Sequence, residues 1–213
     1  MRLYDYWRSS AAYRVRIALN LKGVSYESVP VNIAPGADEQ FSDAYKSVNS
    51  QMRVPAIEVD GQVCGQSMAI IEWLEETVPQ PSLLPADPWE RLQARAFSDT
   101  IACDVHPLNN LSVLAALREQ FGADKDAVTH WYRDWIRRGF AALEPVAAAR
   151  QSGGFLFGDA PGLAEITLVP QVANAHRVNT DLSDFPALVA LDAKCRELEA
   201  FQRAAPEVQP GAL

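Results

Sequence analysis

The sequence has 213 residues, of which 48% are apolar and 22% charged, a balance typical of globular proteins and unlike that of disordered or fibrous chains. Its net charge of −8 argues against a nucleic-acid-binding domain, which needs a basic face. No apolar run approaches the ~20 residues that span a bilayer, and the N-terminus lacks the apolar stretch of a signal peptide. The three cysteines form no CxxC pair and the three histidines lack metal-ligand spacing. We therefore expect a soluble, cytoplasmic protein that has no metal site and binds neither nucleic acid nor membrane.

Residues 1–80 alternate between β-like and helical patterns. We expect a strand at 3–7, a helix at 11–22 that ends before Gly23, a second strand at 24–31 and a short helix at 37–45. Asp60-Gly61 separates two further strand-like runs, 56–59 and 62–64, and predicts a hairpin. A helix follows, with Ser67 as its expected N-cap. This order predicts a βαβ unit followed by an αββα unit.

The composition changes where four prolines fall between residues 79 and 88, and we interpret 81–88 as a linker. Beyond it the pattern is helical to the end, which predicts an α/β domain at 1–80 and an all-helical domain at 89–213. The expected helices are 88–105, 107–121, 125–151, 163–177 and 186–199, with a turn at Gly153-Gly154. Asp87 is the expected N-cap of the first of them, followed by Pro88 at the first helical position. Pro107 and Pro145 are expected to kink or restart their helices. Cys64 and Cys103 stand among apolar residues, which predicts buried thiols.

Val54-Pro55 opens the third expected strand. An arbitrary X-Pro bond is cis only ~5% of the time. A proline at this point of a βαβ–αββα unit, however, resembles the thioredoxin fold, in which that proline is cis. Pro55 would then be structural, and Val54 would pair its main chain with a peptide-like ligand, as an added strand does.

Two polar pairs stand at expected helix starts. Ser67 alone indicates an N-cap, but a helix N-terminus also binds anions, and Gln66 beside it could hold a carboxylate and an amine. Ser9-Ser10 follows the first strand, where one hydroxyl is more often a cap than a catalyst. Ser10 is nearer the expected helix, so we expect it to be better placed than Ser9 to cap it. Since no general base lies nearby in sequence, we expect a hydroxyl and a helix N-terminus to stabilise a bound thiolate rather than a serine nucleophile.

The run from Arg8 to Leu19, RSSAAYRVRIAL, resembles the signature of zeta-class glutathione transferases, a family that includes maleylacetoacetate isomerases. The likeness covers nearly the whole chain and extends through Val54-Pro55, Gln66-Ser67, residues 107–112 and residues 168–175. It implies a thioredoxin-like glutathione-binding domain followed by a helical substrate-binding domain, in a homodimer. It also implies glutathione as cofactor and a small dicarboxylate as substrate.

The resemblance places catalytic hydroxyls at Ser9 and Ser10. The glutathione-binding positions that it implies are Ser9, Ser10, Ala11, Ala12, Tyr13, Arg14, Gln40, Val54, Gln66, Ser67, His106, Asn110, Leu111 and Ser112. For the substrate carboxylates we expect Arg8 and Arg177, because the arginine fork suits a carboxylate. Arg14 and Arg16 are about 200° apart around a helix, so they cannot both face one ligand.

The implied activity is a glutathione-dependent cis–trans isomerisation of maleylacetoacetate or maleylpyruvate. Alternatives are a transferase or reductive dehalogenase on the same scaffold, or a non-catalytic interaction protein. Two positions depart from the family pattern. Ala11 stands where the family usually has a cysteine, and Gly162 with Glu165 allows only half of a capping box.

Overall fold

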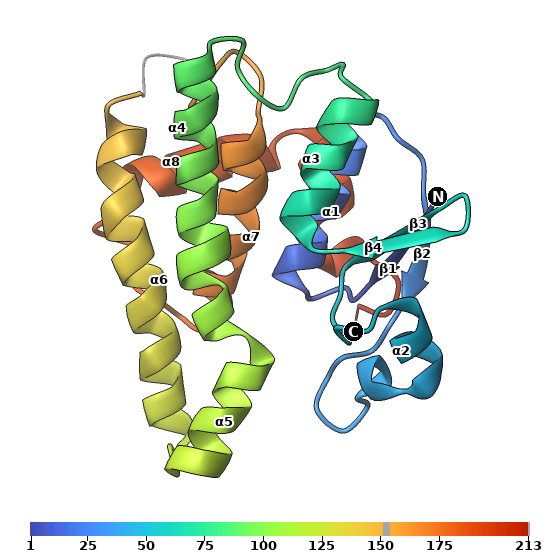
Figure 1. Ribbon diagram of the computed structural model, residues 1–213. Helices are drawn as coiled ribbons and strands as arrows, with labels where there is room; N and C mark the ends of the chain where they lie inside the picture. The colour runs from blue at the N-terminus through green and yellow to red at the C-terminus, as the bar shows by residue number, and fades with distance from the viewer. Residues whose placement is uncertain (151–153, 213) are drawn as a thin grey trace. The chain divides into compact units, whose positions relative to one another are not determined.

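The computed structural model describes residues 1–150 and 154–212, and the chain divides into two units (Figure 1). The first unit comprises Met1–Ser82 together with Arg196–Leu213, and the second comprises Leu83–Cys195. The predicted turn at Gly153-Gly154 and the predicted end of a helix at residue 151 lie partly outside the described residues.

A four-stranded sheet forms the first unit's centre. Its strands are β1 (Arg2–Asp5), β2 (Glu27–Pro30), β3 (Ala56–Val59) and β4 (Gln62–Gly65), in the order β2-β1-β3-β4. β1 pairs parallel with β2 and antiparallel with β3, which forms a hairpin with β4. Asp60 and Gly61 both have positive φ, as a two-residue hairpin turn of this type requires. The predicted thioredoxin-like order of strands is thus confirmed.

Three helices complete the order expected for this unit. α1 (Ser10–Leu21) and α3 (Ser67–Thr77) lie side by side in Figure 1. The single helix expected at 37–45 is instead a 3₁₀ turn, η1 (Glu39–Phe41), followed by α2 (Asp43–Val48). Ser42 is the reason for the break, because its extended backbone ends η1 and its hydroxyl caps α2 by accepting from the Tyr45 N–H.

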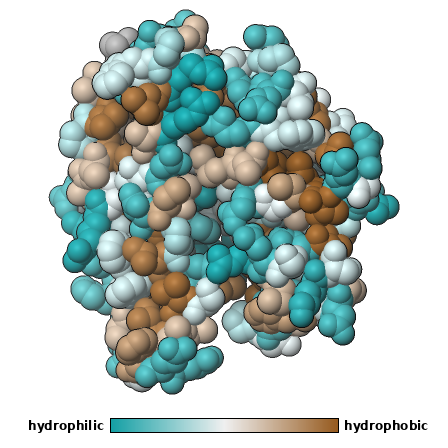
Figure 2. All heavy atoms as spheres, in the orientation of Figure 1, coloured by the Kyte–Doolittle hydropathy of each residue, from teal (hydrophilic) through white to brown (hydrophobic). Residues whose placement is uncertain are grey.

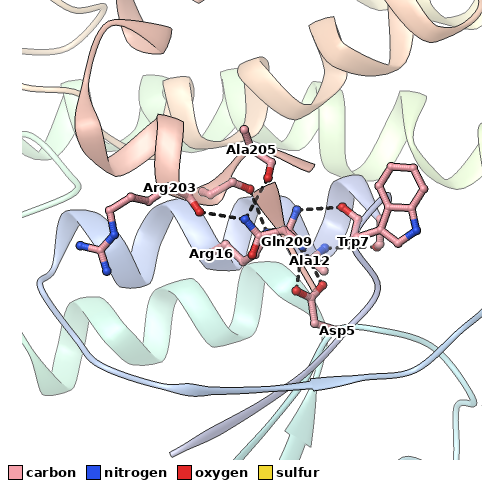
Figure 3. Close-up of polar contacts among 9 residues, drawn as sticks. Asp5, Trp7, Ala12, Arg16, Arg203, Ala205 and Gln209 are labelled. Atoms are coloured by element: carbon pink, nitrogen blue, oxygen red, sulfur yellow. Dashed lines mark hydrogen bonds and ion pairs between the residues drawn. The ribbon is translucent and has the colours of Figure 1, made fainter. Parts of the chain in front are cut away.

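The C-terminal segment belongs with the first unit, whereas the sequence had suggested a helical domain of 89–213. α9 (Glu199–Ala204) packs against α1, and the fully buried Arg16 joins the two (Figure 3). Arg16 donates to both carboxylate oxygens of Asp5 at 2.7 and 2.8 Å, and its Nε donates to the Ala204 carbonyl at 2.9 Å. A buried guanidinium needs such partners, and the C-terminal helix α9 supplies one of them to α1 near the N-terminus.

Helices make up the second unit. They are α4 (Pro88–Asp99), the π-helix η2 (Thr100–Val105), the 3₁₀ turn η3 (Pro107–Asn109), α5 (Leu111–Phe121), α6 (Lys125–Ala148), α7 (Leu163–Arg177) and α8 (Pro186–Arg196). α4, α6 and α7 are the long green, yellow and orange helices of Figure 1. Asp87 caps α4 as predicted, by accepting from the N–H groups of Trp89 and Glu90.

Three features of this unit can be compared with the predictions from the sequence: the helix expected at 88–105, the effect of Pro145 and the capping box at Glu165. The helix expected at 88–105 changes to π geometry after Asp99, where Gly139 of α6 leaves room for Val105: a Cβ at Gly139 would lie 2.3 Å from Val105 Cγ2. Pro145 does not restart α6, which continues through it to Ala148. Proline lacks the N–H that would bond the Ala141 carbonyl, but Ala141 is exposed, so water can hydrate that carbonyl instead. The predicted half capping box is confirmed at α7.

In that half box, Glu165 is buried and accepts from the N–H groups of Gly162 at 2.9 Å and Leu156 at 2.7 Å. Burial nevertheless raises the pKa of the Glu165 carboxyl above its ordinary value, although the two N–H groups oppose the shift.

The surface mixes polar residues with separate apolar patches on the face that Figure 2 shows. Cys64 and Cys103 are exposed, so the prediction of buried thiols was wrong; β4, which carries Cys64, is largely exposed. Within the described residues, no helix has the length and apolar character needed to cross a membrane.

Candidate functional site

Ser9 lies between β1 and α1, where the chain turns from strand to helix. Its hydroxyl oxygen accepts from the Ala12 N–H at 3.2 Å, so Ser9 is the N-cap and Ser10 is the first helical residue. The expectation that Ser10 is better placed to cap was therefore wrong. The Ser9 hydroxyl hydrogen has no acceptor among the described residues, so the same group can cap the helix and donate to a ligand.

The start of α3 lies close to the first turns of α1. Ser67 is the first residue of α3 rather than its cap; the cap position is held by Gln66, at φ 71°, without a side-chain bond to the helix. Arg14 is buried in α1, and its Nη1 lies 3.5 Å from the Ser67 hydroxyl. Arg16 points instead to Asp5, as the spacing of the two arginines predicts. A buried cation thus supports the N-terminal end of α3, which favours an anionic ligand there.

Val54 precedes β3 with its main chain unpaired. The Val54-Pro55 bond is cis, and the N–H and C=O of Val54 make no hydrogen bond within the described parts of the chain. The preceding carbonyl, that of Arg53, is fixed by the Tyr45 hydroxyl at 2.7 Å and by the Asn49 amide at 2.8 Å. Val54 therefore offers a fixed donor and acceptor to an added strand.

The Tyr45 hydroxyl that donates to the Arg53 carbonyl stays neutral. Burial raises the pKa of Tyr45 to about 12. The phenol thus keeps the proton that it donates to the Arg53 carbonyl throughout the physiological range.

Two amide side chains complete the first unit's set. Gln66 donates to the side chain of Gln51, which precedes β3, at 2.9 Å. Gln51 was not anticipated, because a loop glutamine gives no pattern in the sequence. Gln40 is buried in η1, and its amide oxygen has no partner among the described residues. A buried amide oxygen of this kind is suited to a ligand donor.

Within the first unit these groups fit a tripeptide thiol. Main-chain groups at Val54, a helix start at Ser67 and a hydroxyl at Ser9 offer an added-strand pairing, an anion site and a thiolate donor, respectively. Ala11, Ala12 and Tyr13 lie in the first turn of α1, with the Ala12 N–H already taken by Ser9. Nothing in this set depends on a metal ligand.

In the second unit, the predicted positions lie on one short stretch after the π-helix. His106 joins η2 to η3, and Asn110 caps α5 by accepting from the N–H and the hydroxyl of Ser112. Leu111 is 46% exposed, an unusual state for a leucine at the start of a helix. The Asn110 amide oxygen is thus occupied by the cap, which leaves its NH₂ group for a ligand.

Arg177 is the last residue of α7 and is exposed. Its Nη2 donates to the Tyr132 hydroxyl at 2.8 Å, and no carboxylate pairs with it among the described residues. Arg8 is likewise exposed and unpaired within that part of the chain, with its guanidinium 5.6 Å from the Trp7 ring centre. Tyr132 was missed, because a tyrosine on an amphipathic helix has the pattern of a core residue.

Comparisons with known proteins identify the family of the chain. Residues 3–82 match the family model "Glutathione S-transferase, N-terminal domain", and residues 129–191 match "Glutathione S-transferase, C-terminal domain". The maleylpyruvate isomerase of a Ralstonia species is 49% identical over 99% of both chains.

Two solved structures share the fold throughout. A holo structure of a maleylpyruvate isomerase, described as a bacterial zeta-class glutathione S-transferase, is 48% identical with a TM-score of 0.96, and each chain covers 100% of the other. The maleylacetoacetate isomerase of Methylobacterium extorquens AM1, solved with bound malonate and GSH, is 35% identical with a TM-score of 0.94, again over 100% of both chains. With its characteristic serine run, its cis-proline and its two-part fold, the chain belongs to the glutathione S-transferase family of enzymes and, within it, to the zeta class.

Proposed function

We propose that this protein is a glutathione-dependent cis–trans isomerase of maleylpyruvate or maleylacetoacetate. The observation that carries the proposal is the set of unpaired groups in the first unit: the Val54 main chain, the Ser9 hydroxyl hydrogen and the buried Gln40 oxygen. These groups fit glutathione, with which the 35% identical maleylacetoacetate isomerase was solved. Relatives at 48% and 49% identity are named maleylpyruvate isomerases.

When bound, glutathione supplies a thiolate that adds to the electron-poor double bond and leaves again, so that the bond rotates while it is single and no thiol is consumed. The residues of the chain bind glutathione and the substrate and orient them for this reaction. Ser9 donates its hydroxyl hydrogen toward the sulfur position and lowers the thiol pKa, while the free N–H groups at the start of α1 act in the same direction.

The remaining predicted residues divide the ligand between them. Gln66 and Ser67 hold the γ-glutamyl end, Val54 pairs with the cysteinyl main chain and Gln40 meets the glycyl end. His106, Asn110, Leu111 and Ser112 supply the second unit's contacts, with the Asn110 NH₂ group as a donor. Arg8 and Arg177 take the two carboxylates of the substrate, because neither guanidinium pairs with a carboxylate among the described residues.

A dicarboxylate substrate gains support from the relative that was solved with malonate and GSH. Malonate carries two carboxylates on a short chain, as a maleyl compound does. Binding a dianion by a protein of net charge −8 requires a local excess of positive charge. Arg8 and Arg177, which have no carboxylate partner in the described parts of the chain, supply it.

Turnover measured against free thiol tests the proposal. We expect maleylpyruvate or maleylacetoacetate to be converted only when glutathione is present, with the thiol concentration unchanged at the end. Loss of one thiol per product would instead indicate a conjugating transferase, and absence of binding to immobilised glutathione would indicate a non-catalytic interaction protein. Reductive dehalogenation is disfavoured, because Ala11 offers no sulfur for the thiol exchange that this reaction needs.

We further propose that the protein acts in the cytoplasm as a homodimer. All three cysteines are free thiols, two of them exposed, which suits a reducing compartment. The dimer rests on the family resemblance, and light scattering measures it directly: a mass near twice 23.4 kDa is expected.

A further inference from the structure

Arg177 differs from three other arginines of the helical unit in what it contacts. Arg137, Arg138 and Arg150 pair with the carboxylates of Asp184, Asp134 and Glu90, respectively. Arg177 has a neutral partner instead, the hydroxyl of Tyr132, and its guanidinium lies 5.9 Å from the centre of the same ring. A neutral acceptor orients a guanidinium without cancelling its charge, whereas a carboxylate does both.

Tyr132 is itself well fixed. Its side chain is buried in α6, and only 7% of the residue is exposed. Its carbonyl accepts from the Asn109 amide at 3.1 Å, and the adjacent Trp131 donates from Nε1 to the Leu108 carbonyl at 2.9 Å. The same turn of α6 therefore holds η3, which lies between His106 and Asn110, and also holds Arg177.

We propose that Tyr132 is a positioning residue for substrate binding. Its hydroxyl fixes one nitrogen of Arg177 so that the rest of the fork meets a substrate carboxylate, while its main chain fixes the stretch that carries His106 and Asn110. The inference rests on the proposed function, in which Arg177 binds a carboxylate. An arginine at the end of a helix loses much rotamer freedom when it binds, and a fixed partner reduces that loss in advance.

The test is the variant Tyr132→Phe, which removes the hydroxyl and leaves both the ring and the carbonyl bond to Asn109. We expect the KM for maleylpyruvate to rise about 10-fold, the lower end of what the loss of one hydrogen bond to a charged group implies, with kcat changed less than about twofold. The Kd of malonate, measured by calorimetry in the presence of glutathione, should rise by the same factor. Conjugation of a neutral electrophile should stay unchanged.

Two controls separate positioning from general damage. Thr167→Val removes another buried hydroxyl of the same unit, which donates within α7 to the Ala164 carbonyl at 2.9 Å, and it should leave the malonate Kd unchanged. In an Arg177→Ala background, Tyr132→Phe should have no further effect on malonate, because the hydroxyl then has no guanidinium to fix.

Additive effects of the two substitutions, or an equal loss with the neutral electrophile, would overturn the inference. The malonate measurement is independent of turnover. If wild-type protein binds malonate through the Tyr132–Arg177 pair but isomerises neither maleyl compound, the positioning role stands and the proposed reaction fails. If isomerisation is normal and Tyr132→Phe matches wild type in every assay, the reaction stands and the positioning role fails.

Discussion

The two units offer binding groups of different kinds. In the first unit several of them are main-chain groups at points where the chain changes direction, at Val54 and at the helix starts of Ser9 and Ser67. In the second unit they are side chains at helix ends, above all Arg177 and the Asn110 cap. Main-chain groups tolerate changes of side chain, whereas a side-chain contact changes with one substitution.

This difference matches what each unit is proposed to recognise. Glutathione is the same molecule for every member of the family, and a main-chain frame supported by buried networks suits a constant ligand. Substrates differ among members, and side chains on helix ends can vary without disturbing a sheet. Substitutions at the proposed glutathione positions of the first unit should therefore affect all reactions alike, while substitution of Arg177 in the second should separate one substrate from another.

The largest effect is expected for Ser9→Ala, which tests the first half of that comparison. Loss of a donor at a developing charge should lower kcat about 10²-fold for isomerisation and conjugation together. Because Ser9 is also the N-cap of α1, the free energy of unfolding should fall by about 1 kcal/mol. Steady-state kinetics with both substrates and denaturant unfolding measure the two effects, and Ser9→Thr, which keeps a hydroxyl, is the control. An activity loss larger in Ser10→Ala than in Ser9→Ala would assign the thiolate to Ser10.

A smaller effect is expected for Arg177→Lys, which tests the second half. The charge remains, but the planar fork is lost, and the KM for the dicarboxylate should rise about 10-fold. Conjugation of a neutral electrophile should keep its rate, and the comparison of the two substrates is the measurement. An equal loss on both would show that Arg177 serves the fold, and the contrast between the units would then disappear.

The smallest effect concerns Glu165, where the second unit also relies on main-chain groups. Its pKa is raised by burial, so the folded state holds the proton more tightly than the unfolded state. The stability that this provides is fully present below the ordinary glutamic acid value of 4.5 and is lost as pH rises through the raised pKa. Glu165→Gln should remove that decline, which denaturant titrations from about pH 4 to about pH 8 would detect. Parallel stability curves for the two proteins would contradict it.

Local signals predicted much of the fold. The Asp60-Gly61 hairpin, the cap at Asp87 and the strand order depend on short stretches of sequence, and all three are confirmed. The cis bond before Pro55 followed from the resemblance rather than from the residues, which alone favour trans.

What the sequence could not predict depends on tertiary contacts. The buried partners of Arg16 include Ala204, which lies 188 residues away and decides where α9 belongs. The π-helix after Asp99 packs its Val105 where Gly139 lacks a side chain. A glycine within a predicted helix does not indicate which residue will pack against it. At the site, the sequence does not distinguish the N-cap from the first helical residue when two serines are adjacent. The prediction therefore assigned the cap to Ser10, whereas Ser9 is the cap and Ser10 begins the helix. Tyr132 and Gln51 act through partners that only folding brings near.

The bond between Arg16 and Ala204 has a consequence for the order of events on the ribosome. The segment that carries β1, α1 and Arg16 emerges first, but the carbonyl that completes its buried network is translated 188 residues later. Until then Arg16 has its partners at Asp5 and Trp7, while its Nε lacks a buried acceptor. The glutathione-binding unit thus reaches its final hydrogen bonding only after the helical unit has been synthesised, and nascent chains released before residue 204 should be open to proteases at their N-terminal end.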